Sequence, residues 1–212
     1  MDDRRAQAER MAEALLFAAA GPLSLSDLQG RLPAWADGGQ ALADLRARYA
    51  GRGVELTEVA GGWAFRTAPD LAGLMTAERE EPRRLSRAAL ETLAIIAYHQ
   101  PVTRAEIEAV RGVALSRGTL DLLLEVGFVR MRGRRRTPGR PVTFGTTEAF
   151  LEQFGLPSLA DLPGARDLKA AGLLELDLPA DFALPTPATE ASDEDPLDDD
   201  AAPEFYQDAL AR

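Results

Sequence analysis

The sequence predicts a mainly α-helical protein with small β-hairpins, an α+β fold made of two similar domains and a tail. Three segments with helical spacing of apolar residues precede a segment of alternating pattern, and this order occurs twice along the 212 residues. After about residue 164 the chain is rich in proline, alanine and acidic residues, which bury too little apolar surface to fold. We therefore expect a first domain at 1–80, a second domain at 81–163 and a disordered acidic tail at 164–212.

The first domain begins with three helical segments, at about residues 4–20, 24–32 and 38–50. The first segment stops at Gly21-Pro22, and Ser24 or Ser26 can serve as the N-cap of the second. The pattern then changes to alternation over 54–67, around Gly61-Gly62, which predicts a hairpin with a two-residue turn.

The second domain repeats this order, with helical segments at about residues 85–100, 103–111 and 116–126. Ser86 is the expected N-cap of the first helix and Pro101 its stop. Thr103 and Glu106 have the spacing of a capping box at the start of the second. A hairpin follows, and a further helix ends at Gly155. Three helices and a hairpin are the order of a winged helix-turn-helix domain, so the sequence predicts two of them in tandem.

The hairpin of the second domain, residues 128–144, is rich in arginine, and Pro138-Gly139 suits the central positions of a type II turn. We call this hairpin the wing; its candidate residues are Gly133, Arg134, Arg135, Arg136, Pro138, Gly139 and Arg140. A basic wing can contact a nucleic-acid backbone. It can equally be an exposed tip in a chain whose 24 basic residues include one lysine, Lys169, so that arginine is its ordinary basic residue.

Charge is unevenly distributed around a formal net charge of −10. Residues 83–140 hold twelve arginines against five acidic residues, whereas 161–212 hold three basic residues against fourteen acidic ones. Helical spacing places Arg117, Asp121 and Glu125 in one outward row of the helix that would read DNA. Two carboxylates in that row would repel the phosphate groups of DNA, so we expect DNA contact to be at most weak and nonspecific.

The helix at 85–100 is apolar around more of its circumference than a three-helix core covers. Its expected stripe is Leu90, Leu93, Ala94, Ala97 and Tyr98, with Ile95 and Ile96 partly outside it. Either the helix at 147–154 packs over the excess, or a partner protein does. The candidate partner-binding residues are Leu90, Leu93, Ile95, Ile96 and Tyr98.

Several classes of function are excluded or disfavoured by composition. The chain has no cysteine and one histidine, His99, which removes thiolate chemistry, disulfides, two-histidine zinc sites and the usual serine triad. No apolar run approaches the ~18 residues of a membrane span, and no cleavable signal is recognisable. We expect a cytoplasmic protein that is not an enzyme and needs neither cofactor nor metal.

Several segments of the sequence resemble the segregation and condensation protein B family. They are LSRAALETLAIIAYHQPVTRAEIEAVRGV, the TPGRP hairpin, FGTTEAFLEQFGLPSLADLP and, in the first domain, EALLFAAAGPLSLSDL with VELTEVAGGWAFRT. The resemblance runs from about Arg10 to Leu162 and does not include the tail. Two features depart from the family pattern: ALSRGTL is one residue longer than the usual turn, and three adjacent arginines exceed the usual basic content.

The resemblance implies tandem winged-helix domains in a homodimer that pairs mainly through the first domain. It further implies binding to the central part of a kleisin subunit, segregation and condensation protein A, and through it to the SMC ATPase in chromosome condensation and segregation. The protein would lie in the cytoplasm, associated with the nucleoid through the complex.

Met11, Leu15 and Trp63 are candidates for the dimer contact, although each suits the core equally well. The alternative function is that of a winged-helix DNA-binding transcription regulator. It requires sequence-dependent DNA binding, which the acidic row on the third helix of the second domain disfavours.

Overall fold

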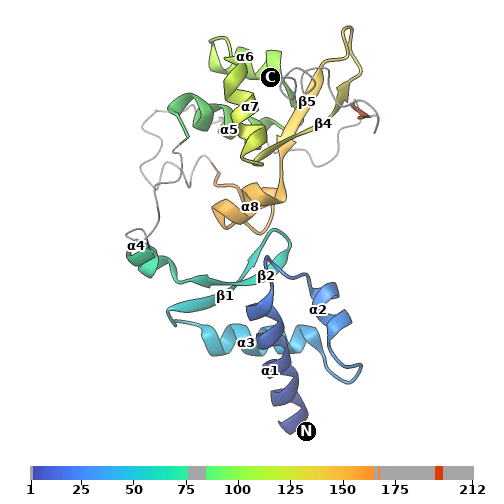
Figure 1. Cartoon of the computed structure of the whole chain (residues 1–212), viewed down its shortest axis with the longest axis vertical. Helices are drawn as coiled ribbons and strands as arrows, with labels where there is room; N and C mark the ends of the chain where they lie inside the picture. Colours follow the sequence, from blue (N-terminus) through green and yellow to red (C-terminus); the bar gives the residue numbers. More distant parts are fainter. Residues whose placement is uncertain (1, 76–84, 165–166, 168–193, 198–212) are drawn as a thin grey trace, which may run out of the picture. The chain divides into compact units, whose positions relative to one another are not determined.

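The computed structural model describes residues 2–75, 85–164, 167 and 194–197. By internal contacts the chain divides into two compact units. The first unit consists of Met1–Arg84 with Leu151–Asp161, and the second of Leu85–Phe150 with Leu162–Arg212. Each unit contains three helices followed by a β-hairpin, so the predicted α+β fold with winged-helix order is confirmed (Figure 1).

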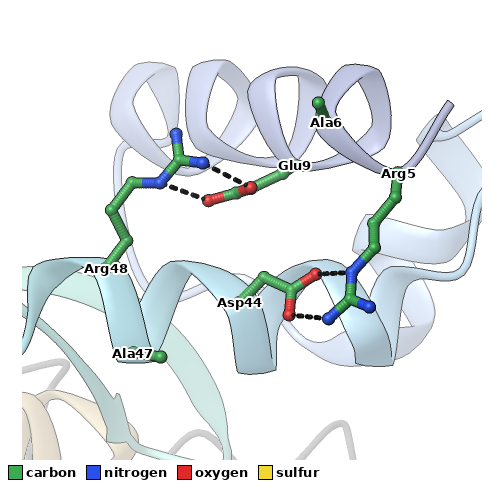
Figure 2. A pocket seen from close by; sticks show the side chains of 6 residues that line it. All are labelled: Arg5, Ala6, Glu9, Asp44, Ala47 and Arg48. Atoms are coloured by element: carbon green, nitrogen blue, oxygen red, sulfur yellow. Dashed lines mark hydrogen bonds and ion pairs between the residues drawn. The ribbon is translucent and has the colours of Figure 1, made fainter. Parts of the chain in front are cut away.

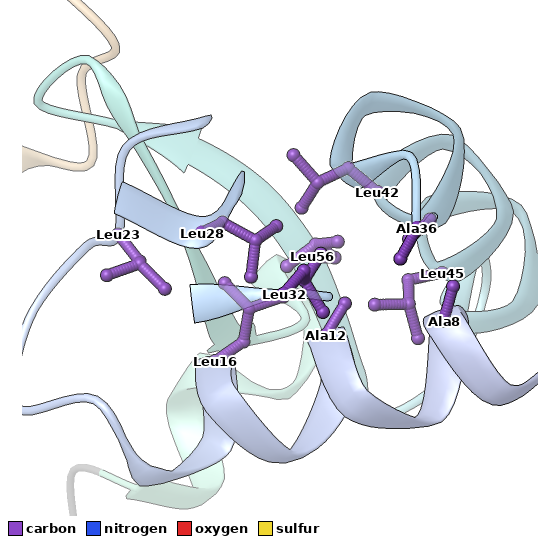
Figure 3. Close-up of a cluster of buried hydrophobic side chains, with 11 residues drawn as sticks. Ala8, Ala12, Leu16, Leu23, Leu28, Leu32, Ala36, Leu42, Leu45 and Leu56 are labelled. Atoms are coloured by element: carbon purple, nitrogen blue, oxygen red, sulfur yellow. The ribbon is translucent and has the colours of Figure 1, made fainter. Parts of the chain in front are cut away.

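The first unit starts with three helices, α1 (Asp2–Ala18), α2 (Leu25–Arg31) and α3 (Gly38–Tyr49). The antiparallel strands β1 (Val54–Val59) and β2 (Gly62–Thr67) follow, then η1 (Pro69–Leu71) and α4 (Ala72–Met75). The helices and the hairpin enclose one core (Figure 3). Its buried members are Ala8, Ala12, Leu16, Leu23, Leu28, Leu32, Ala36, Ala41, Leu42, Leu45 and Leu56.

Two pairs of charged side chains join α1 to α3 on the outside of this core (Figure 2). Arg5 donates to both carboxylate oxygens of Asp44 at 2.6 Å, and Arg48 pairs with Glu9 at 2.7 Å. The Arg5 guanidinium holds the pKa of the Asp44 carboxyl below its usual value. The four residues line a shallow pocket between α1 and α3, so the charges of this pocket are paired with one another.

The hairpin turn of the first unit lies one position earlier than the sequence predicts. Ala60 and Gly61 occupy its centre with φ of 51° and 70°, and Val59 pairs with Gly62. Gly62 serves another purpose, since a Cβ atom there would lie 3.0 Å from the Pro22 backbone. That close approach allows Leu23 and Trp63 to exchange two backbone hydrogen bonds.

The second unit contains α5 (Arg87–His99), β3 (Val102–Thr103), α6 (Arg104–Arg111) and α7 (Arg117–Glu125). The wing strands β4 (Val129–Arg135) and β5 (Val142–Thr146) follow. Next come α8 (Glu148–Phe154), whose residues from Leu151 onward belong to the first unit, and η2 (Leu159–Asp161), which belongs to the first unit entirely. The sheet has the order β3-β5-β4-β6, in which β6 (Glu194–Pro196) comes from the tail. Strand β6 is an element that the tail's composition did not predict.

The expected helix starts of the second unit are confirmed. Ser86 accepts a hydrogen bond from the Ala89 amide, and Thr103 and Glu106 form a complete capping box. Gly112 ends α6 with a left-handed φ of 71°. Most of the expected tail lies outside the described residues. Within the described residues, no helix is long and apolar enough to cross a membrane.

Candidate protein-binding surface

Helix α5 has a buried face and an exposed face. The buried side chains are Ala89, Thr92, Leu93, Ile96 and Ala97. Ile96 is 0% exposed and Leu93 is 2% exposed, so both are core residues. The expectation that Ile96 lies partly outside the core is therefore wrong, because α5 is rotated so that Ile96 points inward.

The opposite face carries a row at spacing four, Leu90, Ala94 and Tyr98, which we call the α5 outer row. Leu90 is 49% exposed and Ala94 is exposed, whereas Tyr98 and the neighbouring Ile95 are half-buried. The Tyr98 hydroxyl donates to the Pro163 carbonyl at 2.8 Å, and burial raises the pKa of this hydroxyl. Of the candidate residues, this row brings together Leu90 and Tyr98 with Ile95 beside them.

Charged groups hold α5 against α6 beside this row. Glu91 pairs with Arg87 at 3.0 Å and with Arg111 at 3.3 Å. The Arg87 hydrogen bond, followed by that of Arg111, holds the pKa of Glu91 below its usual value. Helix α5, which carries the outer row, therefore contacts the core through its buried side chains and α6 through the Glu91–Arg111 pair.

The wing has the predicted turn. Gly139 has a φ of 85°, and the Arg140 amide donates to the Thr137 carbonyl at 2.9 Å, as in a type II turn at Pro138-Gly139. Gly133 lies in β4 at a register shift against β5. Arg134 donates to the Arg140 carbonyl at 3.3 Å, within the hairpin itself.

Most wing arginines have acidic partners within the unit. Arg135 pairs with Glu106 at 2.8 Å and donates to the Pro101 carbonyl at 3.0 Å. Arg136 and Arg140 both contact Asp195 of β6 at 2.7 Å. Sequence reasoning missed Asp195, because nothing local in the tail indicates a partner more than fifty positions away.

Helix α7, the helix that would read DNA, differs in part from its expected outward row. Arg117 and Glu125 are exposed, but Asp121 is half-buried, and its Oδ1 has no hydrogen-bond partner among the described residues. The placement of Asp121 on the outer face is thus wrong. Exposed Glu125 still presents a carboxylate where a DNA-reading helix needs donors.

In the first unit, the candidate dimer residues Met11, Leu15 and Trp63 are half-buried and pack against the core. Arg46 also lies over the Trp63 ring at 5.9 Å. A more exposed side chain occurs elsewhere on the same helix as Met11 and Leu15: Phe17 is 85% exposed and lines a groove. The groove is lined by Arg10, Glu13, Ala14, Phe17, Tyr49, Val54 and Phe65. Sequence reasoning missed Phe17, although an aromatic residue beside the core positions of α1 was a usable signal.

Each of the two units has three helices followed by a β-hairpin, and each exposes apolar side chains on its helices, so the chain is a protein of two winged-helix units. Comparison with known proteins gives the particular family. The chain belongs to the family described as segregation and condensation complex subunit ScpB, whose family model matches residues 10–165.

Curated relatives support this membership. A segregation and condensation protein B from Syntrophotalea carbinolica is 50% identical over 161 residues, covering 73% of this chain and 80% of the relative. Another from Moorella thermoacetica is 47% identical over 163 residues, covering 75% and 83%.

Two solved structures are also similar in sequence. A conserved hypothetical protein from Chlorobium tepidum is 38% identical, with 74% of this chain and 100% of that chain covered and a TM-score of 0.33. ScpB from Mycobacterium tuberculosis is 34% identical, with 72% and 97% covered and a TM-score of 0.33.

Proposed function

We propose that this chain is a non-enzymatic adaptor subunit of an SMC complex that acts in chromosome condensation and segregation. As a homodimer it binds the central part of the kleisin subunit, segregation and condensation protein A, and through it the SMC ATPase. It works in the cytoplasm and is associated with the nucleoid through the complex. Family membership supports the role in the segregation and condensation complex.

The observation that supports kleisin binding is the exposure of apolar side chains in the α5 outer row. Leu90 is a large apolar side chain 49% exposed on a helix whose other face is fully packed. Because Leu90 is about half exposed, covering it with a partner helix gains about half of the ~1.5–3 kcal/mol of a complete burial. A helix laid along a row at spacing four is a common mode of peptide recognition. Tyr98 adds an aromatic side chain at the end of the row.

Light scattering during size-exclusion chromatography tests the proposal. The purified chain should co-elute with the central kleisin segment at micromolar concentration. Leu90→Glu should weaken this binding about tenfold or more, because it places a charge in the apolar contact. Leu25→Glu is the matched control, since Leu25 is 47% exposed on α2 of the other unit.

Two outcomes would contradict the proposal. If the unmodified chain does not co-elute with the kleisin segment, the proposed adaptor function is wrong. If Leu90→Glu and Leu25→Glu lower the binding affinity equally, the α5 outer row is not the binding site. Both variants should retain their helical circular dichroism. Ile96→Glu is unsuitable here, because Ile96 belongs to the core.

The alternative function, a transcription regulator, is not favoured by the site. Exposed Glu125 on α7 opposes the donor pattern that base reading needs. That function predicts tight, sequence-dependent DNA binding that survives salt of about 0.2 M. Competition between DNA duplexes of different sequence measures this dependence directly.

A further inference from the structure

The edge of the wing is covered by a strand from the acidic tail. Strand β6 (Glu194–Pro196) pairs antiparallel with β4, in the register Gly133 with Pro196, Arg134 with Asp195 and Arg135 with Glu194. The strand therefore closes a sheet edge whose backbone groups would otherwise be open to another ligand. This contact lies wholly within the second unit.

The wing is built to let this strand approach closely. A Cβ atom at Gly133 would lie 2.4 Å from the Asp195 carbonyl oxygen and 3.6 Å from the Glu194 Cβ. The three nearest atoms to that position all belong to β6. The docked strand therefore requires glycine at position 133.

The acidic side chains of β6 neutralise the wing. Asp195 accepts from Arg136 through one carboxylate oxygen and from Arg140 through the other, each at 2.7 Å. The Arg136 guanidinium, and then that of Arg140, hold the pKa of Asp195 below its usual value. On the other side, Glu194 lies 3.6 Å from Arg132, and its second oxygen has no hydrogen-bond partner among the described residues.

We propose that the wing is a nonspecific binding surface for the phosphate backbone of duplex DNA, and that β6 masks it in cis. This inference goes beyond the adaptor function and does not rest on it. The tail strand competes with DNA for Arg132, Arg136 and Arg140. When β6 is displaced, the guanidinium groups are available to phosphate.

The geometry at Asp195 points to phosphate as the competing ligand. One carboxylate offers two oxygens on a single carbon, and Arg136 and Arg140 each take one of them. A phosphodiester offers two non-bridging oxygens on a single phosphorus in the same way, and guanidinium groups suit both anions. Exposed Glu125 on α7 disfavours base reading, so contact with the phosphate backbone is the proposed mode of binding.

The contact between β6 and β4 is weak enough for a ligand to displace it, and it forms readily in the absence of a ligand because both strands belong to one chain. It consists of three residue pairs at a sheet edge, and its charge pairs at the surface are each worth little. Because β6 belongs to the same chain, it competes at a high effective concentration without a second molecule.

Fluorescence anisotropy with a labelled 30-base-pair duplex tests the proposal on the full chain. The double variant Glu194→Gln/Asp195→Asn should bind at least about tenfold more tightly than the unmodified chain at 50 mM salt. Its plot of log K against log salt should be steeper by about 2.7, since each of three added phosphate contacts contributes about 0.9. The matched control Asp198→Asn/Asp199→Asn changes the net charge equally and keeps both β6 carboxylates.

Equal affinity and slope for the double variant and its control would overturn the proposal, because net charge alone would then explain the binding. Gly133→Ala provides a second, uncharged way to release the strand. It should increase DNA affinity and salt dependence like the double variant, while circular dichroism stays unchanged.

A synthetic peptide of residues 190–200 separates DNA from an acidic protein partner. Adding the peptide should compete with the duplex for the wing of the Glu194→Gln/Asp195→Asn variant, because this variant keeps Gly133 and its sheet edge still accepts an unmodified strand. If this variant binds the peptide but not the duplex, the wing is a site for acidic peptides and the DNA proposal is wrong.

Discussion

Ile96 and Leu90 lie on opposite faces of α5, one with 0% and the other with 49% of its side chain exposed. We expect Ile96→Ala to lower the free energy of unfolding by about 2–5 kcal/mol, because truncation removes buried contacts and leaves a cavity. Leu90→Ala should change the same quantity by about 0.5 kcal/mol or less. Urea denaturation followed by circular dichroism measures both, and equal losses would contradict the two-faced description of α5.

Gln100 is a buried polar residue that joins α5 to the wing. Its amide nitrogen donates to the Thr146 hydroxyl, and its carbonyl oxygen accepts from the Thr146 backbone amide, both at 2.9 Å. Gln100→Ala should lower the free energy of unfolding by about 1–3 kcal/mol, because both Thr146 groups lose their buried partner. Gln153→Ala, at an exposed position, is the control. A similar urea midpoint for both variants would show that this bridge contributes little.

The spacing of apolar residues predicts helices, but it does not predict the burial of each individual side chain. The sequence predicts that α5 is apolar around more of its circumference than a three-helix core covers, and such a pattern does not determine which side of the helix faces inward. Packing decided that Ile96 is core and that Leu90 is exposed. The role of Gln100 depends on Thr146, 46 positions away, and has no local signal.

At the scale of elements, α6 is joined to the start of α7 through Glu108. Its carboxylate accepts from the Leu115 backbone amide at 2.9 Å and from Arg104 at 3.1 Å. The Leu115 hydrogen bond, followed by that of Arg104, holds the pKa of Glu108 below its usual 4.5. The ionised form therefore stabilises the fold fully above about pH 4.5, and this contribution is lost as the pH falls through the lower, folded-state pKa.

Glu108→Gln should consequently be less stable than the unmodified chain at pH 7, with the difference in urea midpoint narrowing between pH 4.5 and pH 3. Other carboxylates titrate in both proteins and cancel in the comparison. Glu148→Gln, at an exposed position on α8, is the control. A difference that stays constant down to pH 3 would show that the charge of Glu108 is irrelevant to the link.

Elements with local signals were predicted, and those that depend on distant pairing were not. The caps at Ser86 and Thr103 and the turn at Pro138-Gly139 follow from residues within three positions of one another. Strand β6 pairs with β4 about sixty positions earlier, and its acidic residues favour a strand only when arginines lie opposite. The short β3 likewise exists only through its pairing with β5.

At the scale of the whole molecule, the net charge of −10 hides two opposite regions that meet in one sheet. The arginine-rich wing and the acidic tail contact each other through β4 and β6. Composition alone predicts a basic domain and a separate acidic tail. Under the proposed masking, this pairing keeps the wing arginines from duplex phosphate until β6 is displaced.

The proposed homodimer is tested through the first unit, where Phe17 is 85% exposed beside the groove that includes Phe65 and Val54. In a two-fold dimer every contact occurs twice, so burying Phe17 contributes about 3–6 kcal/mol in total. Phe17→Glu should therefore shift the mass measured by light scattering from twice 22.8 kDa towards 22.8 kDa at low micromolar concentration. Leu25→Glu, on another face of the unit, should leave the dimer intact. A dimeric Phe17→Glu variant would place the contact elsewhere, and a monomeric unmodified chain would remove the dimer from the proposed function.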